Sequence, residues 1–416
     1  MNPKGKIGVI SLGCPRNVVD TENMLGSLVK KGFRVVDLDK ADIAVVNTCA
    51  FIADAKKESI EAILDLIELK KEGRLKKVIV AGCLAQRYRD ELKKELPEVD
   101  AFIGKPDLRP SLERFAIIPR HYGYLKICEG CVHKCSFCVI PKIKGAFASL
   151  DINCVLKEVK LFDKQGISEL NIIGQDISGY GLDLYAAKQL PELLGKIVKN
   201  SGNIHWLRLL YLYPDKIIRK LLKVIKDSPK VCRYIDLPVQ HINSRILKLM
   251  NRQASQKEII GLIALIRKEL PEAAIRTSLI VGFPTESEKE FKELLGFMRE
   301  VEFQRLGAFT YSAEEGTPAD KLSGQVPEKI KQERFNRVMS LQKEISNRVN
   351  QRFLGKTLEV LIDEKEGAGQ YLGRSQFDAP EVDGNVYVKS SRVLKPGDFV
   401  KVKIIDTLEY DLVGEA

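Results

Sequence analysis

Residues 124–138 of the chain read YLKICEGCVHKCSFC and hold four of its nine cysteines. The four residues before Cys128 have the pattern of a β-strand, so the cysteines follow a predicted strand end. Zinc ribbons separate two cysteine pairs by a loop of about 12–20 residues, whereas only three residues stand between Cys131 and Cys135. The bacterial ferredoxin run has two residues in each early gap and does not fit either. The spacing that remains is Cys-x3-Cys-x2-Cys, formed by Cys131, Cys135 and Cys138.

Three thiolates on one tight loop can hold a four-iron cluster and leave one iron open to an outside ligand. Catalytic zinc follows the same logic, because three protein ligands leave a reactive position on the ion. The alternative is a structural zinc ion bound by Cys128 together with the same three cysteines. We favour the iron–sulfur cluster and assign no role to Cys128.

The composition indicates a globular protein. The chain has 416 residues, of which 44% are apolar and 30% charged, and at about 150 residues per domain this length predicts roughly three domains. It contains neither the uninterrupted apolar run of a membrane span nor the apolar core of a secretory signal. We therefore expect a soluble, cytoplasmic protein with no membrane partner. In that reducing compartment clustered cysteines indicate metal binding or catalysis, whereas Cys154 and Cys232 are expected to be small buried apolar residues.

The hydrophobic pattern predicts an α/β fold in four parts. Strands and helices alternate over residues 1–108, which indicates a parallel sheet with helices on its faces. The alternation resumes over residues 120–326 with six strand–helix units, which favours a partial α/β barrel. Residues 327–352 form one predicted helix that connects the domains. Residues 353–416 contain short strands separated by turns, typical of a small antiparallel β-barrel.

Three further cysteines lie far apart in the sequence but at equivalent places in the first predicted sheet. Cys14, Cys49 and Cys83 each follow directly after a predicted parallel strand. The carboxyl ends of parallel strands meet at one edge of a sheet, where open α/β sheets bind ligands. The alternative is three unrelated buried cysteines. We expect the three thiolates to converge on a second iron–sulfur cluster with an open iron.

The Cys-x3-Cys-x2-Cys loop at the end of a first barrel strand resembles the radical S-adenosylmethionine (SAM) enzymes. The segments SLGCPRN (residues 11–17), VVNTCAFI (45–52) and AGCLAQRY (81–88) are similar to the N-terminal domain of the methylthiotransferases, and the last predicted domain looks like their TRAM barrel. The resemblance covers nearly the whole chain. It implies a transferase with two 4Fe–4S clusters and SAM that inserts a methylthio group at an unactivated carbon. It also implies an external electron donor and an external sulfur source as partners.

Two branches of this family act on different substrates. One modifies an adenosine beside a tRNA anticodon, and the other modifies the β-carbon of an aspartate in small-subunit ribosomal protein 12. The segment DAPEVDG (residues 378–384) resembles the second branch. Charge agrees, because residues 353–416 hold 8 basic and 12 acidic residues, whereas a barrel that binds RNA should be basic. We expect Asp378, Glu381 and Asp383 to bind the basic ribosomal protein; the alternative is an acidic turn without a partner.

The resemblance also implies that four residues at predicted strand ends contact SAM: Gln175, Arg208, Gln240 and Gly282. Each polar residue among them could instead make a structural hydrogen bond, and Gly282 could serve a strand-to-helix turn. The chemistry belongs to the cofactors, so we predict no acid–base residue.

One segment departs from the family pattern. The family carries several arginines after its Ile-Pro, whereas residues 140–151, IPKIKGAFASLD, retain only Lys142 and Lys144 as basic residues. This departure puts a substrate or cofactor contact of that loop in doubt and leaves the predicted cysteine ligands unaffected.

Two other functions stay open from the sequence. The first is a tRNA adenosine methylthiotransferase, with tRNA as its partner. The second, ranked lower, is a non-catalytic RNA-binding or zinc-binding protein, which the formal net charge of +11 permits.

Overall fold

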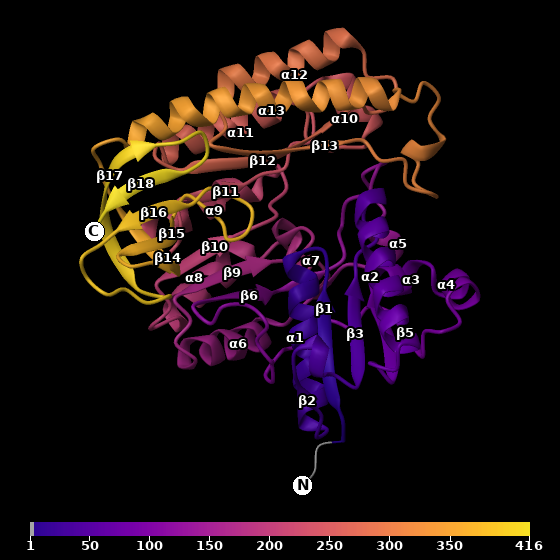
Figure 1. Cartoon of the computed structure of the whole chain (residues 1–416). Helices are drawn as coiled ribbons and strands as arrows, with labels where there is room; N and C mark the ends of the chain where they lie inside the picture. Colours follow the sequence, from indigo (N-terminus) through magenta and orange to yellow (C-terminus); the bar gives the residue numbers. More distant parts are fainter. Residues whose placement is uncertain (1–3) are drawn as a thin grey trace.

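The computed structural model describes residues 4–416, which form three folded parts in contact with one another (Figure 1). The N-terminal domain, coloured indigo to violet, lies against a central barrel, and the yellow C-terminal barrel packs on another side of that barrel. No helix within residues 4–416 is both long enough and apolar enough to span a bilayer.

The N-terminal domain is a five-stranded sheet of order β2-β1-β3-β4-β5 in which all strands run parallel. Its strands are β1 (Lys6–Ser11), β2 (Arg34–Val35), β3 (Ile43–Thr48), β4 (Lys77–Gly82) and β5 (Ala101–Ile103). Its helices are α1 (Pro15–Lys30), α2 (Ala53–Lys71), α3 (Cys83–Arg87) and α4 (Arg89–Glu95). The predicted parallel α/β fold is confirmed. The edge strands β2 and β5 are too short to carry an alternating hydrophobic pattern, so the sequence does not predict them.

The order of these strands creates a binding edge. The chain goes from β1 outward to β2 and then returns to β3 on the opposite side of β1. At such a switch point the connections leave in opposite directions and open a crevice at the carboxyl ends of the two central strands. Cys14 follows β1 and Cys49 follows β3, so both lie at this crevice.

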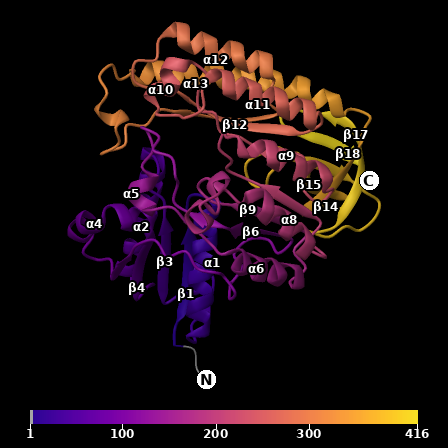
Figure 2. The same cartoon turned by 180° about the vertical axis from the view of Figure 1, so that it is seen from behind.

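The central domain is a partial barrel of six parallel strands, as predicted. The strands form two sheets, β10-β9-β6 and β11-β12-β13, which a parallel bridge between Leu207 and Val231 connects. They are β6 (Tyr122–Lys126), β9 (Glu169–Ile173), β10 (Trp206–Leu209), β11 (Tyr234–Asp236), β12 (Ala274–Val281) and β13 (Arg305–Thr310). The outer helices, seen from behind in Figure 2, are α6 (Ile152–Lys164), α8 (Leu190–Asn200), α9 (Ile217–Asp227), α11 (Gln256–Glu269) and α12 (Glu288–Val301). Smaller elements in the loops are β7 (Cys128–Glu129), β8 (Ala148–Ser149), α5 (Ile140–Lys144), α7 (Leu182–Tyr185) and α10 (Ser244–Leu249).

A long helix connects this domain to the last one. Helix α13 (Glu328–Asn350) runs beside α12 and β13 and buries Val338 and Ile345 in the core of the central barrel. The C-terminal strands close into a barrel of order β14-β15-β16-β18-β17. They are β14 (Thr357–Gly367), β15 (Gln370–Ser375), β16 (Val386–Lys389), β17 (Phe399–Thr407) and β18 (Leu412–Glu415). The predicted small barrel is confirmed, with one difference from the antiparallel expectation: β16 and β18 pair in parallel.

Candidate active site between two groups of cysteines

A cavity of about 280 Å³ lies between the N-terminal domain and the carboxyl ends of the central barrel strands. Cys131, Cys135 and Cys138 line it from the barrel, and Arg16 and Phe51 line it from the N-terminal domain. Barrels of alternating strands and helices place their active sites at this end.

The three barrel cysteines lie on one loop between β7 and α5. The N–H of His133 donates to Sγ of Cys131 at 3.4 Å, and the N–H of Cys138 donates to the carbonyl oxygen of Cys135 at 3.1 Å. Burial raises the pKa of Cys131 to about 12 and that of Cys138 to about 11. These two thiols are therefore neutral at pH 7 until a metal displaces their protons.

Cys14, Cys49 and Cys83 stand at the carboxyl ends of β1, β3 and β4. A Cβ atom placed on Gly13 would lie 2.8 Å from Cβ and 3.2 Å from Sγ of Cys49, so the loop that carries Cys14 passes directly over Cys49. Burial is the main cause that raises the pKa of Cys83 to about 12, and the nearby thiols of Cys49 and Cys14 add to it. Three segments far apart in the sequence thus bring their thiols to one edge of the sheet.

Two buried asparagines fix the loops around these thiols. Asn17 Nδ2 donates to the carbonyl oxygens of Leu12 at 2.8 Å and Thr48 at 3.2 Å, and Asn47 Nδ2 donates to the carbonyl oxygen of Asn17 at 2.9 Å. Gly82, with a φ of +93°, packs so closely that a Cβ there would lie 2.1 Å from Asn47 Oδ1. Only glycine fits this approach. Sequence reasoning missed both asparagines, although each lies in a segment that resembles the family.

Neither group of cysteines forms a site for a single ion. Within residues 4–416, no three His, Cys, Asp or Glu side chains are close enough together to hold one metal ion. A four-iron cluster is wider than an ion, so the thiolates that hold it stand further apart than the ligands of one ion, and thiolates are the donor set that such a cluster takes. Cys128 is fully buried, and its thiol is directed at the carbonyl oxygen of Asp176 at 3.6 Å. This position disfavours a zinc ion bound by all four clustered cysteines.

Arg16 connects the two groups. Its Nε donates to Sγ of Cys14 at 3.3 Å, and its Nη1 donates across the domain boundary to the carbonyl oxygen of Gly174 at 2.9 Å. The guanidinium also lies 4.5 Å from the ring centre of Tyr211. Burial acts to raise the pKa of Cys14, but Arg16 and backbone N–H groups outweigh it and hold that pKa below its usual value. The Arg16 side chain thus touches the N-terminal cysteine site and the barrel cavity at once.

Four buried charges join the two domains beside this arginine. Asp20 of α1 pairs with Lys126 and Lys144 of the barrel, and Glu129 pairs with the same two lysines at 2.7 and 2.8 Å. Gln175 Nε2 donates to Glu129 at 3.3 Å. Lys144 is one of the two basic residues that remain in the loop that departs from the family pattern. The structure places its ammonium group in the interior, where it ties the cysteine loop to the N-terminal domain.

One wall of the cavity is aromatic and charged. The ring of His133 stacks on Tyr213 at 3.5 Å, and His133 Nε2 lies 3.1 Å from Asp176 Oδ2. Arg252 lies 4.1 Å from the ring centre of Tyr213 and donates to the carbonyl oxygen of Pro238 at 2.6 Å. Sequence reasoning missed His133, Tyr213 and Arg252, although His133 lies inside the cysteine loop. Their positions give the cavity a flat wall beside the barrel cysteines.

Two of the four residues expected to contact SAM line this cavity. They are Gln175 and Gln240, which follow β9 and β11. Gly282 lies outside the lining, and its N–H donates to Glu286 Oε2 at 3.1 Å. The SAM contacts of these three residues stay predictions.

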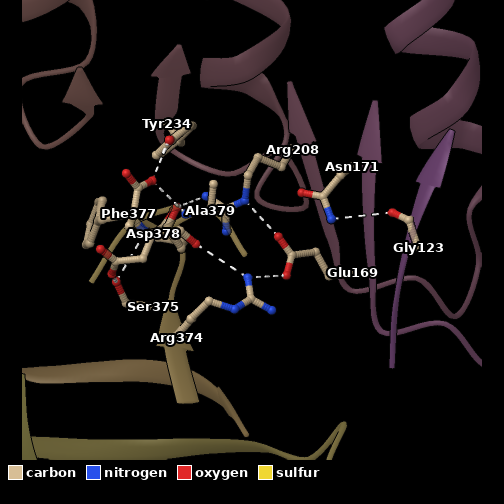
Figure 3. Close-up of polar contacts among 12 residues, drawn as sticks. Gly123, Glu169, Asn171, Arg208, Tyr234, Arg374, Ser375, Phe377, Asp378 and Ala379 are labelled. Carbon is tan, nitrogen blue, oxygen red and sulfur yellow. Dashed lines mark hydrogen bonds and ion pairs between the residues drawn. The ribbon is translucent and has the colours of Figure 1, made fainter. Parts of the chain in front are cut away.

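The fourth residue, Arg208, is not at the cavity, so its predicted SAM contact is wrong. Its side chain is fully buried, and Nε donates to Glu169 Oε1 at 2.7 Å while Nη1 donates to the carbonyl oxygen of Gln376 at 2.8 Å (Figure 3). Glu169 begins β9, at the amino-terminal end of the barrel. Arg208 therefore serves the contact with the C-terminal domain.

The acidic loop of the C-terminal domain also differs from its prediction. Asp378 is 1% exposed and pairs with Arg305 of β13, at 2.7 Å from Nε. Asp383 accepts from the hydroxyl of Tyr234 at 2.5 Å and lies 3.4 Å from Nε of Arg276. Both carboxylates are buried against the central barrel, so the prediction that they bind substrate is wrong.

Glu381 is the exposed residue among the three acids of this loop. It accepts a hydrogen bond from the Tyr122 hydroxyl at 2.9 Å. Its role in substrate binding stays a prediction.

Comparison with known families agrees with this architecture. The model described as "Uncharacterized protein family UPF0004" matches residues 6–104, the Radical SAM superfamily matches residues 125–298, and the TRAM domain matches residues 354–416.

Curated relatives match along the whole chain. The "Ribosomal protein uS12 methylthiotransferase RimO" of Clostridioides difficile is 44% identical over 99% of this chain and 98% of its own length. The protein of the same name from Caldicellulosiruptor saccharolyticus is 45% identical over 99% of both chains. Among solved structures, the cobalamin-dependent SAM radical enzyme OxsB has a similar fold, with a TM-score of 0.52 at 11% identity over 82% of this chain and 56% of that chain. The chain therefore belongs to the radical SAM methylthiotransferases, in the family of the ribosomal protein uS12 methylthiotransferases.

Proposed function

We propose that this enzyme inserts a methylthio group at the β-carbon of an aspartate in ribosomal protein uS12. The observation that carries the proposal is the match, along the whole chain, to relatives named for that reaction. The arrangement of the cysteines supports it, because one group lines the cavity and the other contacts it through Arg16. A ribosomal substrate also places the enzyme in the cytoplasm.

In this proposal two sets of three thiolates each hold one 4Fe–4S cluster. The set for the cluster that binds SAM is Cys131, Cys135 and Cys138, and the set for the auxiliary cluster is Cys14, Cys49 and Cys83. When bound, the clusters and SAM supply the one-electron and sulfur-transfer chemistry that protein side chains lack. An external reductant and an external sulfur source complete the reaction.

The side chains around the cavity bind and orient the reactants. Gln175 and Gln240 offer hydrogen-bonding groups toward SAM, and the stacked rings of His133 and Tyr213 form a flat wall on which a planar group can pack. Phe309 and Phe51 line the cavity and are 47% and 42% exposed. Exposed aromatic residues at the mouth of a cavity suit a polypeptide substrate, which would cover them and exclude water.

Each domain has its own role in the proposed reaction. We assign the auxiliary cluster to residues 1–108 and the SAM cluster to residues 120–326. Residues 327–352 connect the second domain to the TRAM barrel, residues 353–416, which we assign to substrate recognition. Exposed Glu381 is the residue of the acidic loop that stays available for that task.

The test is a reaction with defined substrates. Anaerobically reconstituted enzyme is incubated with SAM, a reductant and sulfide, together with either uS12 or tRNA. We expect the added mass of one methylthio group on an aspartate of uS12 and none on tRNA, located by mass spectrometry. Modified tRNA with unmodified uS12 would instead establish the tRNA adenosine reaction. Zinc in place of iron, without deoxyadenosine release, would refute an enzymatic role.

Matched cysteine variants test the ligand assignment. Cys14→Ala removes a proposed ligand of the auxiliary cluster, whereas Cys154→Ala removes a half-buried thiol of α6 that belongs to neither group. We expect the first variant to lose methylthio transfer and about half of its iron, since each cluster holds four irons. The second variant should keep both. Equal iron contents in the two variants would contradict the assignment of Cys14.

A further inference from the structure

The cavity contains guanidinium groups that pair with no carboxylate of residues 4–416. Two arginines line it, Arg16 and Arg252. Of the acids in the lining, Asp176 faces His133 at 3.1 Å, and Glu314 pairs outside the cavity with Arg87 at 2.7 Å. Neither acid contacts Arg16 or Arg252, so both guanidinium groups can still pair with an incoming anion.

The guanidinium group of Arg252 already has several partners in the wall of the cavity. Its Nη2 donates to the carbonyl oxygen of Pro238, its Nη1 lies 3.8 Å from Sγ of Cys135, and its guanidinium stacks on Tyr213. An anion beside it would occupy the space next to the barrel cysteines.

Arg16 stands between the two groups of cysteines and keeps free donors. Its Nε and one Nη1 bond are used by Cys14 and Gly174. Within residues 4–416, Nη2 makes no hydrogen bond, and a guanidinium has five N–H groups in all. The side chain is half-buried and lines the cavity. A planar anion can therefore take the remaining N–H groups as paired donors.

The orientation of Arg16 is fixed from the barrel side. Tyr211, on which it stacks, has a φ of +65°, a strained value for a residue with a side chain. Its N–H donates to Asp236 Oδ2 at 2.8 Å, and Asp236 Oδ1 accepts from Arg276 at 3.1 Å. Arg276 in turn faces Asp383 of the TRAM domain. Buried charges thus hold the ring that supports the arginine.

We propose that Arg16 binds the side-chain carboxylate of the substrate aspartate and thereby selects aspartate as the residue to be modified. This inference rests on the proposed function. The carbon that receives sulfur must lie between the two groups of cysteines, which is where Arg16 lies. In aspartate that carbon is bonded directly to the carboxylate carbon, so the carboxylate must come within reach of the same guanidinium.

The test compares two peptides that span the modified segment of uS12, one with aspartate and one with asparagine at the target position. Asparagine has nearly the same shape and lacks the charge. Holoenzyme is titrated with each labelled peptide without reductant, and binding is followed by fluorescence anisotropy; turnover with reductant then gives kcat and KM. Wild-type enzyme should prefer the aspartate peptide by about 10- to 100-fold, the range expected for a charged hydrogen-bonded pair.

Three variants identify the residue responsible. Arg16→Gln should lose the preference in binding and in kcat/KM, and Arg16→Lys, which keeps the charge without the paired donors, should keep part of it. The matched control is Arg114→Gln, which also breaks a contact across the domain boundary, because Arg114 pairs with Glu22 of α1 at 3.6 Å and with Glu158 of α6 at 3.0 Å, but neither Arg114 nor its partners line the cavity. It should keep the full preference for aspartate. Iron content is measured for each variant, because loss of the auxiliary cluster would weaken turnover of both peptides equally without changing their binding ratio.

The outcomes separate this inference from the proposed function. Wild-type enzyme that modifies the aspartate peptide but binds both peptides equally would refute the role of Arg16. Arg16→Gln with an unchanged preference would refute it as well. Wild-type enzyme that neither binds nor modifies the aspartate peptide would overturn the proposed function, and the inference with it.

Discussion

Replacing Glu169 by Gln tests whether buried ion pairs hold the TRAM domain on the central barrel. Glu169 is fully buried and accepts from Arg208 Nε and Arg374 Nη1, both at 2.7 Å. Glutamine keeps the shape of the side chain but removes its charge and turns an N–H group toward one guanidinium. Arg208 then has no carboxylate partner.

The expected loss of stability in Glu169→Gln depends on which carboxylates the two arginines keep as partners. Breaking a buried ion pair by removing one member costs about 3–5 kcal/mol. Arg374 keeps Asp363, at 2.7 and 2.8 Å, so the lower end of this range, about 3 kcal/mol, applies. Each kcal/mol lowers the melting temperature of a domain of this size by about 2–4 °C, which gives a decrease of about 6–12 °C.

Glu359→Gln is the matched control at the same domain boundary. Glu359 of β14 pairs with His205 of the barrel at 2.9 Å, but the two side chains are 44% and 47% exposed. Exposed pairs contribute less than about 1 kcal/mol, so the melting temperature should fall by less than about 4 °C.

Trp206 provides the assay. It is the single tryptophan of the chain, lies in β10 at 3% exposure, and packs 4.8 Å from Phe399 of the TRAM domain. Its fluorescence therefore reports on this boundary, while circular dichroism reports on the whole fold. In Glu169→Gln the fluorescence transition should precede the circular dichroism transition. Equal shifts for the buried and the exposed variant would refute the reasoning.

Three shorter predictions concern the opposite end of the barrel. Cys83→Ser should lose about half of the iron and all methylthio transfer while SAM cleavage continues, measured by iron analysis and chromatography of deoxyadenosine. Asp236→Asn weakens the hold on the Tyr211 N–H, so kcat should fall about 10- to 100-fold, and the melting temperature should fall as well, because the buried pair of Asp236 with Arg276 is also broken. Burial acts to raise the pKa of Glu129, but Lys126 and Lys144 outweigh burial and lower that pKa to about 2. Its stabilisation is therefore complete above the ordinary carboxyl pKa of about 4.3 and is lost as pH falls toward 2, so Glu129→Gln should reduce the drop in melting temperature of cluster-free protein between pH 5 and pH 3.

The sequence predicts the fold where the information is local. Each long strand of the two α/β domains has an apolar run of its own, and the cysteines come directly after such runs, so their convergence follows from strand direction alone. The strands β2 and β5, of two and three residues, carry no such pattern. Their pairing is decided by the neighbouring strands.

The predicted roles of Arg208, Asp378 and Asp383 are wrong for a different reason, which is that their partners lie far away in the sequence. Arg374 and Glu169 are 205 residues apart, and Asp383 and Tyr234 are 149 apart. The charge count of the TRAM domain does not show which acids are buried against a distant arginine, so the sequence predicts a substrate surface where the structure has the buried carboxylates of Asp378 and Asp383. The side chain of Arg208 is directed at the amino-terminal end of the barrel, whereas SAM is expected at the carboxyl end. A strand pattern predicts on which face of the sheet a side chain lies, but not toward which end of the barrel it is directed.

The two ends of the central barrel are thus joined to different domains by the same kind of contact. Buried ion pairs attach the TRAM loop at the amino-terminal end, and Asp20 with Lys126, Glu129 and Lys144 attaches the N-terminal domain near the carboxyl end. Buried ion pairs add little net stability over apolar contacts, because removing the charges from water is costly. Their bonds are directional, however, whereas apolar surfaces can slide past one another. Directional contacts suit a boundary that has to hold two groups of cysteines at a fixed separation, with Arg16 between them.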